Sequence, residues 1–458
     1  MIAAVPWVLL AACSSEPPTG TSGAEPDLLP SLPAATREGA RLNAEWYQSW
    51  ATGEVTAVVA TRDGGAVVAG LRAPELVDAT HASGAAFVMK LDAAGSIAWT
   101  RALSQRPRTV VELPSGDLAL GLVAGGFDGP LGDGYGGAAI ELWTGAGARR
   151  WSRVLSRSAA DRVDPRAMTI DSAGDVVMVA ACRGTLRSDD VVQPCPGDVH
   201  LLVLKIGNDG ALRFVRAMAA INEARRPGED VWMSPTAVTV DAADHVIVAG
   251  QYGGGRIELG TATLPKASRW DAFLLELDAQ GAPVRGKSFP ADAAWISGMS
   301  FDRARRLLIT GGYALRVELD GETRTAPFGG SDGPDAAGFV ALLDSSWARV
   351  WDREWYDASH GDRVWAGGDA VLLQGVWGGG RDGWDPRLWV ARLRLDDGTV
   401  EASYLWDNLG WNASHAALAP DGALFVAGGY VDTIDFGLGP LPQTGSELVD
   451  AMYVVKLR

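Results

Sequence analysis

Short apolar runs separated by Asp/Gly turns recur along most of this chain. The clearest copy extends from Val55 to Leu103. It contains an apolar strand, a tight turn, a second strand ending in glycine, a long irregular segment, a third strand, another turn and a fourth strand centred on Trp99. Four short strands per repeat, at a spacing far above the helical period, are typical of a propeller blade. No sustained 3.6-residue apolar period occurs, so we expect little helix.

The copies can be aligned on the small residue that ends each second strand. These residues are Gly70, Gly121, Ala180, Gly250, Gly311, Gly375 and Gly428. The apolar runs before them are continuous rather than alternating, which predicts strands buried on both faces between stacked sheets. The pattern therefore predicts an all-β, seven-bladed β-propeller with four antiparallel strands per blade over residues 43–458.

The last copy ends at Arg458, directly after its third strand. The segment from Ala44 to Trp50 has no blade of its own and is similar to the fourth strands around Trp99 and Trp151. We expect this N-terminal strand to complete the last blade and close the ring, because closure removes two exposed sheet edges. An independent N-terminal strand is the alternative.

The repeats resemble the bacterial beta-propeller repeat found in extracellular and lipoprotein chains of delta-proteobacterial type. Residues 245–281 (HVIVAGQYGGGRIELGTATLPKASRWDAFLLELDAQG) and 422–457 (GALFVAGGYVDTIDFGLGPLPQTGSELVDAMYVVKL) carry the resemblance, which covers residues 43–458. Copies two, five and six depart from the pattern at their turns. The resemblance implies a propeller fold and an exported location, and it supplies no catalytic residue.

The N-terminus is similar to a bacterial lipoprotein signal. A short apolar run leads into Leu9-Leu10-Ala11-Ala12-Cys13. The likeness implies a signal peptide of residues 1–12, cleavage before Cys13 and acylation of that cysteine, so that lipid anchors the protein. No Lys or Arg precedes the run, which departs from the usual signal. An ordinary signal peptide with a chance cysteine is the alternative.

Residues 13–42 follow as a Pro-, Ser- and Gly-rich tether. The apolar run before them, with about ten residues, is too short to span a bilayer. Ser14, directly after the cysteine, favours the outer membrane by analogy with lipoprotein sorting, and the side of the membrane that the protein faces stays open.

The chain is acidic, with 56 Asp and Glu against 40 Lys and Arg and a net charge of −16. This charge argues against a nucleic-acid partner, whose phosphates would be repelled. It fits a soluble, outward-facing protein, or one that attracts cations. We expect a monomer.

Cys182 and Cys195 lie close together in the third copy. Exported proteins oxidise such pairs, so we expect a disulfide that closes one inter-strand loop. Metal binding by these two cysteines is the alternative.

The two ends of the ring are expected to differ. Short Asp/Gly hairpins lie at one end, while long, varied loops and the crossings between blades lie at the other, where binding sites usually form. Trp99, Trp151 and Trp351 occupy the fourth-strand position and are expected to pack between blades. Trp232, Trp270, Trp295, Trp377, Trp384 and Trp411 instead fall in predicted long loops.

Tryptophan beside charged residues suits sugar stacking or a protein anchor. The predicted ligand-binding residues are Trp377, Arg381, Asp382, Trp384, Trp411, Trp232 and Trp270. The alternative is that these tryptophans cap the channel or cover the seams between blades.

Motifs for catalysis are absent from the sequence. Its five histidines (His81, His200, His245, His360 and His415) show no metal-ligand spacing, and no nucleophile elbow or phosphate loop occurs. We therefore predict no catalytic residue, no cofactor and no metal ligand, while residues from separate blades could still converge on the channel.

The sequence favours a lipid-anchored outer-membrane propeller that binds a protein or glycan of the cell envelope through its long-loop end. The alternative is an envelope enzyme, either a glycan lyase or hydrolase or a quinone-dependent dehydrogenase, with its site at the channel.

Overall fold

The computed structural model describes residues 42–50, 53–72, 85–124, 137–157, 160–188, 191–221, 231–259, 262–326, 336–356, 360–377, 387–406, 415–430, 433–442 and 451–458. These residues form strands, turns and bends, so the chain is all-β, as the sequence predicts. None of them forms a helix that could cross a membrane. The predicted signal peptide, Cys13 and the tether up to residue 41 lie outside the described residues.

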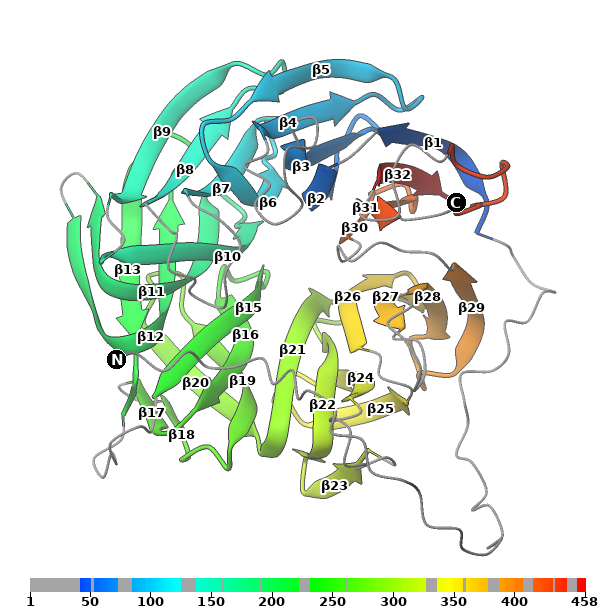
Figure 1. Cartoon of the computed structure of the whole chain (residues 1–458). Helices are drawn as coiled ribbons and strands as arrows, with labels where there is room; N and C mark the ends of the chain where they lie inside the picture. The colour runs from blue at the N-terminus through cyan, green and yellow to red at the C-terminus, as the bar shows by residue number, and fades with distance from the viewer. Residues whose placement is uncertain are drawn as a thin grey trace, which may run out of the picture.

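Antiparallel sheets follow one another around a central axis in a propeller arrangement (Figure 1). In chain order, the first holds β2 (Gly53–Ala60), β3 (Ala66–Arg72), β4 (Ala85–Leu91) and β5 (Ile97–Ala102). The next holds β6 (Arg106–Glu112), β7 (Leu118–Ala124), β8 (Gly137–Trp143) and β9 (Arg149–Ser156). The third holds β10 (Arg162–Ile170), β11 (Val176–Ser188), β12 (Val191–Ile206) and β13 (Leu212–Met218).

The fourth sheet holds β15 (Trp232–Val240), β16 (Val246–Gly253), β19 (Trp270–Leu277) and β20 (Pro283–Phe289). A parallel bridge between Val199 and Trp232 joins it to the third. Beside it, β14 (Ala220–Ile221), β17 (Arg256–Leu259) and β18 (Ala262–Leu264) form a small separate sheet.

The remaining sheets continue the same order. One holds β21 (Ala291–Phe301), β22 (Leu307–Leu319), β24 (Ala336–Leu343) and β25 (Arg349–Trp355), with β23 (Glu322–Thr325) paired to β22. Another holds β26 (His360–Gly367), β27 (Ala370–Trp377), β28 (Arg387–Arg394) and β29 (Val400–Trp406). The last holds β30 (His415–Leu418), β31 (Leu424–Tyr430), β32 (Ala451–Leu457) and β1 (Ala44–Trp50).

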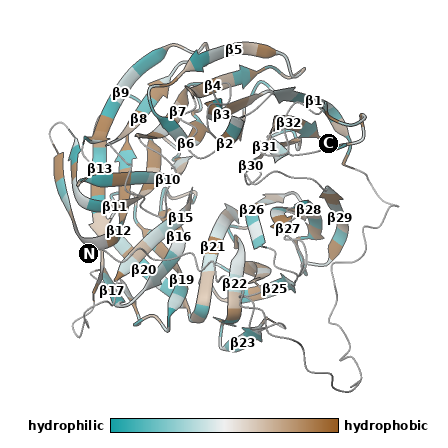
Figure 2. Cartoon of the chain, viewed as in Figure 1, coloured by the Kyte–Doolittle hydropathy of each residue, from teal (hydrophilic) through white to brown (hydrophobic). Residues whose placement is uncertain are grey.

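The middle strands are buried on both faces, as their continuous apolar runs predict. On β3, Val67 packs in a cluster with Leu118 and Leu120 of the following sheet, while the adjacent Val68 packs with Ala427 and Val454 of the last sheet. Successive side chains of one strand thus fill two different seams. The outer strands, such as β5 and β9, carry hydrophilic stretches instead (Figure 2).

In several sheets, a tryptophan on the outer strand bonds to a turn of the next sheet and packs against it. The indole N–H of Trp99 on β5 donates to the carbonyl of Gly145 at 2.9 Å, in the turn between β8 and β9. Its ring covers Gly147 of that turn. The same arrangement recurs for Trp46 on Gly95, Trp151 on Gly210 and Trp351 on Gly398. The expected packing of Trp99, Trp151 and Trp351 between sheets is therefore confirmed.

At four seams, an arginine two residues after the outer-strand aromatic residue donates a second hydrogen bond to the same turn. Arg101 Nε donates to the Gly147 carbonyl at 2.8 Å. Equivalent bonds link Arg153 to Gly210, Arg216 to Gly281 and Arg353 to Asp397. Each of these four seams therefore has a stacked ring (Trp99, Trp151, Phe214 or Trp351) and an arginine on one turn of the neighbouring sheet.

At one seam, the arginine is on the outer strand and the tryptophan is in the turn of the next sheet. On β20 the ring position is occupied by Arg285, and the turn position is Trp347, which has a φ of 68°. The Arg285 guanidinium lies 4.0 Å from the centroid of the Trp347 ring. The same stacking is thus kept with cation and aromatic group reversed.

The first described strand joins the last. β1 pairs antiparallel with β32, with Trp50 opposite Met452, and blue β1 lies beside red β32 in Figure 1. Asn43 and Arg458 exchange backbone bonds of 2.9 Å. Glu45 accepts ion pairs from Lys456 at 3.0 Å and Arg458 at 3.1 Å.

Cys182 and Cys195 form a disulfide. The expected irregular loop between them is wrong, because β11 and β12 continue past the sheet as a hairpin in which Gly184 lies opposite Cys195. Thr185, Leu186, Val191 and Val192 have high strand propensity, which favours this extended pairing. In the folded protein the bond thus crosslinks two paired strands rather than the ends of an irregular loop.

We expect reduction of the disulfide to lower the free energy of unfolding by about 3 kcal/mol, because the closed loop restricts the unfolded chain. The measurement is denaturant unfolding of protein lacking residues 1–41, with and without dithiothreitol. The double variant Cys182→Ser/Cys195→Ser is the control and should not respond to the reductant. Two free thiols in the unreduced, denatured protein would contradict the pairing.

Candidate functional site

The innermost strand of each sheet lines the axis, and most of these strands bulge at the same point. The ladder between β2 and β3 skips one residue, Thr56. The equivalent skipped residues are Arg108, Arg166, Thr236, Ser297 and Asp362. A bulge bends its strand and redirects the extra side chain, which is why bulges often occur beside binding sites.

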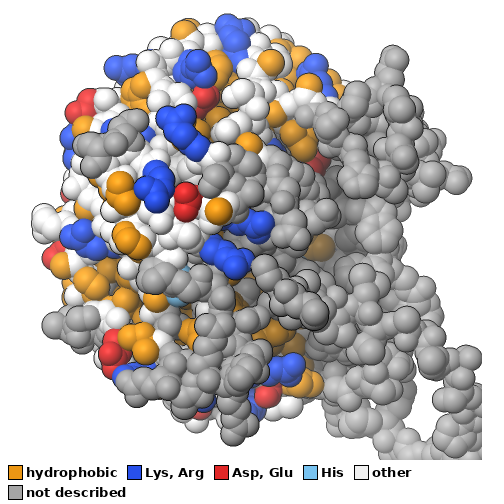
Figure 3. All heavy atoms as spheres, turned by 60° about the vertical axis from the view of Figure 1, so that its left-hand side comes forward, with side chains coloured by type: hydrophobic (Ala, Val, Ile, Leu, Met, Phe, Trp, Pro, Cys, Tyr) orange, Lys and Arg blue, Asp and Glu red, His pale blue; other side chains and the backbone are white. Residues whose placement is uncertain are grey.

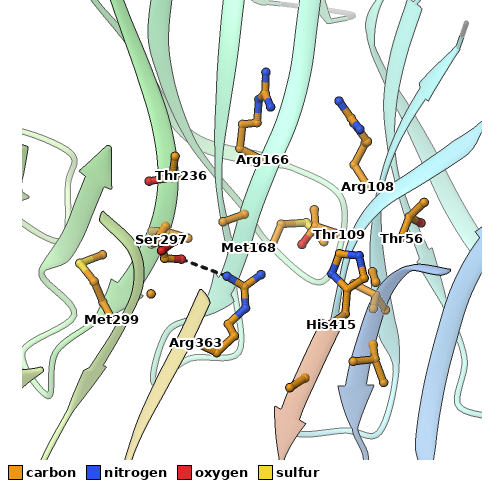
Figure 4. Close-up of a pocket in the computed structure, with 18 residues that line it drawn as sticks. Thr56, Arg108, Thr109, Arg166, Met168, Thr236, Ser297, Met299, Arg363 and His415 are labelled. Atoms are coloured by element: carbon orange, nitrogen blue, oxygen red, sulfur yellow. Dashed lines mark hydrogen bonds between the residues drawn. The ribbon is translucent and has the colours of Figure 1, made fainter. Parts of the chain in front are cut away.

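A cavity of about 280 Å³ lies on the axis between these strands (Figure 4). Residues of β2, β6, β10, β15, β21, β26 and β30 line it, so the inner strand of every four-stranded unit contributes. Its volume is close to the lower end of small-molecule pockets, about 300 Å³. It can hold one group of a ligand, of the size of a single sugar.

Hydroxyl groups at the bulges bind across the seams. The hydroxyls of Thr236 and Ser297 donate to the backbone carbonyls of Ile296 and Gly361, each on the next inner strand. These side chains fix the strands around the cavity rather than offering free donors to it.

Arginines provide the charge of the lining. Arg108, Arg166 and Arg363 line the cavity. Among the described lining residues, His415 is the only histidine and none is acidic. Arg108 and Arg166 both ion-pair with Asp164, at 3.2 and 2.9 Å. In Figure 4 their side chains point toward the same end of the axis.

Arg363 differs from the other two in its partners. It is exposed to the cavity, and its Nη1 donates to the carbonyls of Ser297 and Asp362 at 3.0 and 3.1 Å. Among the described residues, no carboxylate lies within ion-pair distance of it. Burial lowers the pKa of Arg363 and outweighs the attraction of Asp362.

The carboxylate of Asp362 is engaged elsewhere. One oxygen lies 3.1 Å from His360 Nε2, and the other accepts a bond of 3.3 Å from Gln374 Nε2. Burial opposes ionisation, but His360 lowers the pKa of Asp362, and in turn Asp362 raises the pKa of His360 against burial. The direct partners of the Asp362 carboxylate are therefore His360 and Gln374, and Arg363 only attracts it from further away.

His415 faces Arg363 across the open centre of the cavity (Figure 4). Burial, assisted by repulsion from Arg363, lowers the pKa of His415 to about 4. The imidazole is thus neutral at neutral pH and can donate or accept a hydrogen bond.

One aromatic pair lies beside the cavity. Trp295 and His360 meet edge to face with centroids 5.9 Å apart. Trp295 lies two residues before Ser297 on β21, and His360 two residues before Asp362 on β26.

Two predicted ligand residues come together at the fourth sheet. Trp232 and Trp270 meet edge to face at 6.3 Å, both opposite Gly253, and the Arg269 guanidinium lies 5.4 Å from the Trp270 ring centroid. Their predicted place in long loops is wrong, because they begin β15 and β19. Trp295 likewise lies within β21. The strands extend further because antiparallel pairing continues beyond the apolar core.

The predicted sixth-copy site is described only at its edge. Trp377 ends β27 and pairs with Arg387. Arg381, Asp382, Trp384 and Trp411 lie outside the described residues.

Charged side chains elsewhere can be followed on one face of the molecule. On the face that carries β9 and β13, Lys and Arg side chains are dispersed among uncharged ones (Figure 3). Within the described ranges, no group of three or more His, Cys, Asp or Glu could hold a metal ion.

A scan against protein-family models found no match, and a search of curated proteins also found none. Among solved structures, the polysaccharide lyase Uly1 is 11% identical, with 93% of this chain and 94% of that chain covered and a TM-score of 0.48. A europium-containing methanol dehydrogenase is 11% identical, covers 93% and 95%, and has a TM-score of 0.42. BamB from Moraxella catarrhalis is 12% identical, covers 88% and 85%, and has a TM-score of 0.39. Similarities at this level carry no argument about function.

Proposed function

We propose that this chain is a seven-bladed, ring-closed propeller, anchored to the outer membrane by lipid on Cys13, that binds a glycan of the cell envelope. The antiparallel pairing of β1 with β32 supports closure. The lipoprotein-like segment before Cys13 supports the anchor. The protein works as a monomer and as a binding module rather than an enzyme.

The axial cavity is the observation that carries this function. It has the volume of one sugar unit and lies at the convergence of the inner strands. Its polar side chains suit recognition: guanidiniums that donate hydrogen bonds and the neutral imidazole of His415. General acid–base work needs a proton donor and a base that converge on the ligand, whereas the carboxylate of Asp164 is held by two arginines.

The aromatic pair of the fourth sheet supports a glycan over a protein partner. Trp232 and Trp270 are both half-buried, so each retains ring surface for a pyranose to stack on. Arg269 beside them can donate to sugar hydroxyls or carboxylates. A long glycan could contact this pair while one of its units occupies the cavity.

The test is binding of protein lacking residues 1–41 to an array of envelope glycans. We expect Trp232→Ala/Trp270→Ala to weaken glycan binding about tenfold, equal to about 1.4 kcal/mol, because stacking area is lost. Ile97→Ala, an exposed site on β5, is the matched control and should bind as the parent does. Thermal unfolding must be unchanged in both variants.

Retention of an envelope protein with no glycan bound would overturn the glycan assignment. New reducing ends released from a bound glycan would establish an enzyme at the channel instead.

A further inference from the structure

We propose that the axial cavity is an oxyanion site, in which Arg363 from one side and Arg108 and Arg166 from the other hold a carboxylate, sulfate or phosphate group of the ligand. This inference rests on the proposed function and specifies its ligand as anionic. It is unexpected from the whole chain, whose net charge is −16.

The first argument is the chemistry of the lining. Three of its side chains are arginines, and none of the described lining residues is acidic. A guanidinium presents donors in a planar fork that matches two oxygens of an oxyanion. Inside a partly enclosed cavity such bonds are less weakened by water than they are on a surface.

The second argument is the placement of the cations. Arg108 on β6 and Arg166 on β10 belong to adjacent sheets, whereas Arg363 on β26 lies across the axis from them (Figure 4). Arg108 and Arg166 are held by Asp164, two residues before Arg166 on its own strand. This carboxylate fixes their direction without entering the lining of the cavity.

The third argument concerns Arg363 itself. Its described hydrogen bonds go from Nη1 to two backbone carbonyls, which satisfy donors without neutralising charge. The adjacent Asp362 turns its oxygens to His360 and Gln374. Arg363 therefore faces the cavity with no carboxylate in direct contact among the described residues, and a bound anion would neutralise its charge.

His415 gives a readout that does not require the natural ligand. Repulsion from Arg363 is one cause of its low pKa. An anion bound at Arg363 offsets this repulsion and raises the pKa of His415. Replacing Arg363 by glutamine removes the repulsion permanently, so the pKa rises as well but no longer responds to anions.

The experiment uses protein lacking residues 1–41 with inorganic sulfate, inorganic phosphate and glucuronate as probes and glucose as the neutral control. We expect the three oxyanions to bind in calorimetric titration, with R363Q weaker by roughly tenfold or more, and glucose not to bind. Arg392→Gln, an exposed arginine on β28 paired with Glu401, is the matched control and should bind as the parent does. NMR titration should show the pKa of His415 rising when sulfate saturates the parent protein.

R363K separates loss of the charge from loss of the planar fork and should show intermediate affinity. Equal oxyanion binding by R363Q and the parent, or a His415 pKa unmoved by saturating anion, would overturn the proposal. Preference for glucuronate over sulfate would identify a carboxylated sugar, and the reverse a sulfated one.

The outcomes separate this inference from the proposed function. If glycans bind R363Q and the parent equally well, the oxyanion site fails and glycan binding stands. If oxyanions bind and no envelope glycan does, the site stands and the proposed function fails.

Discussion

Protein that starts at residue 52, and so lacks β1, is expected to lose its cooperative fold and aggregate. Every residue of β32 is buried, and β1 pairs with it from Met452 to Leu457. Without β1, β32 would expose unpaired N–H and C=O groups beside apolar side chains, which is a template for association between chains. Protein that starts at residue 42 keeps β1 and is the matched control.

The loss would extend beyond one strand because Trp46 reaches the next sheet. Its indole donates to the Ala93 carbonyl at 2.9 Å, and its ring covers Gly95. It also packs at 5.9 Å against Phe425 of β31. Full burial of a large apolar side chain stabilises by about 1.5–3 kcal/mol, and the half-buried Trp46 contributes part of that, before the strand's hydrogen bonds are counted. The seam between the last and first sheets therefore depends on β1.

Size-exclusion chromatography and thermal unfolding by circular dichroism measure the effect. A synthetic peptide of residues 42–52 added during refolding should restore monomer and the unfolding transition. An unchanged monomer with an unchanged transition after deletion would show that β1 does not close the ring.

The repeat pattern predicts much of this architecture, and the reason is physical. A sheet that lies between two others must have middle strands that are apolar on both faces, and Val67 and Val68 show the result. The fourth-strand tryptophans are recognisable because each must lie over a turn glycine. One seam does not fit this pattern, because Arg285 is on the outer strand and Trp347 is in the turn.

The axial site was not predicted from the sequence. Arg108 and Arg166 resemble ordinary strand arginines until their bulges are known, and Arg363 follows the bulged Asp362. A bulge depends on pairing between strands. A usable signal did exist. Thr56 and Arg166 each lie fourteen residues before the small residue that ends the second strand, Gly70 and Ala180. Counting fourteen residues back from Gly70 and Ala180 places Thr56 and Arg166 at equivalent positions on their inner strands.

Strands β15 and β19 begin earlier than the sequence predicts, for a related reason. Trp232 and Trp270 lie beyond the apolar runs of their strands, where sequence suggests a loop. Pairing of both with Gly253 extends β15, β16 and β19 together. Because that pairing is between distant segments, it cannot be read from the local sequence.

The substitution Gly147→Ala is expected to lower the free energy of unfolding by about 2–5 kcal/mol. Gly147 has a φ of 79°, a conformation that costs a residue with a Cβ roughly 1–2 kcal/mol. Its added Cβ would also lie 2.8 Å from the Trp99 ring. Moving that ring strains the bond to Gly145 and the packing at the seam, at about 1–3 kcal/mol.

Gly116 in the same sheet offers a closely matched control. Its turn has the same hydrogen-bond pattern and a φ of 80°, but a Cβ there would meet nothing within 4 Å. Gly116→Ala should therefore show the backbone cost alone. The difference between the two variants in chemical denaturation isolates the contact with Trp99. In a Trp99→Ala background, Gly147→Ala and Gly116→Ala should lower the free energy of unfolding equally, because the ring is gone. A difference that persists would show that the strain lies in the turn and not in the contact with Trp99.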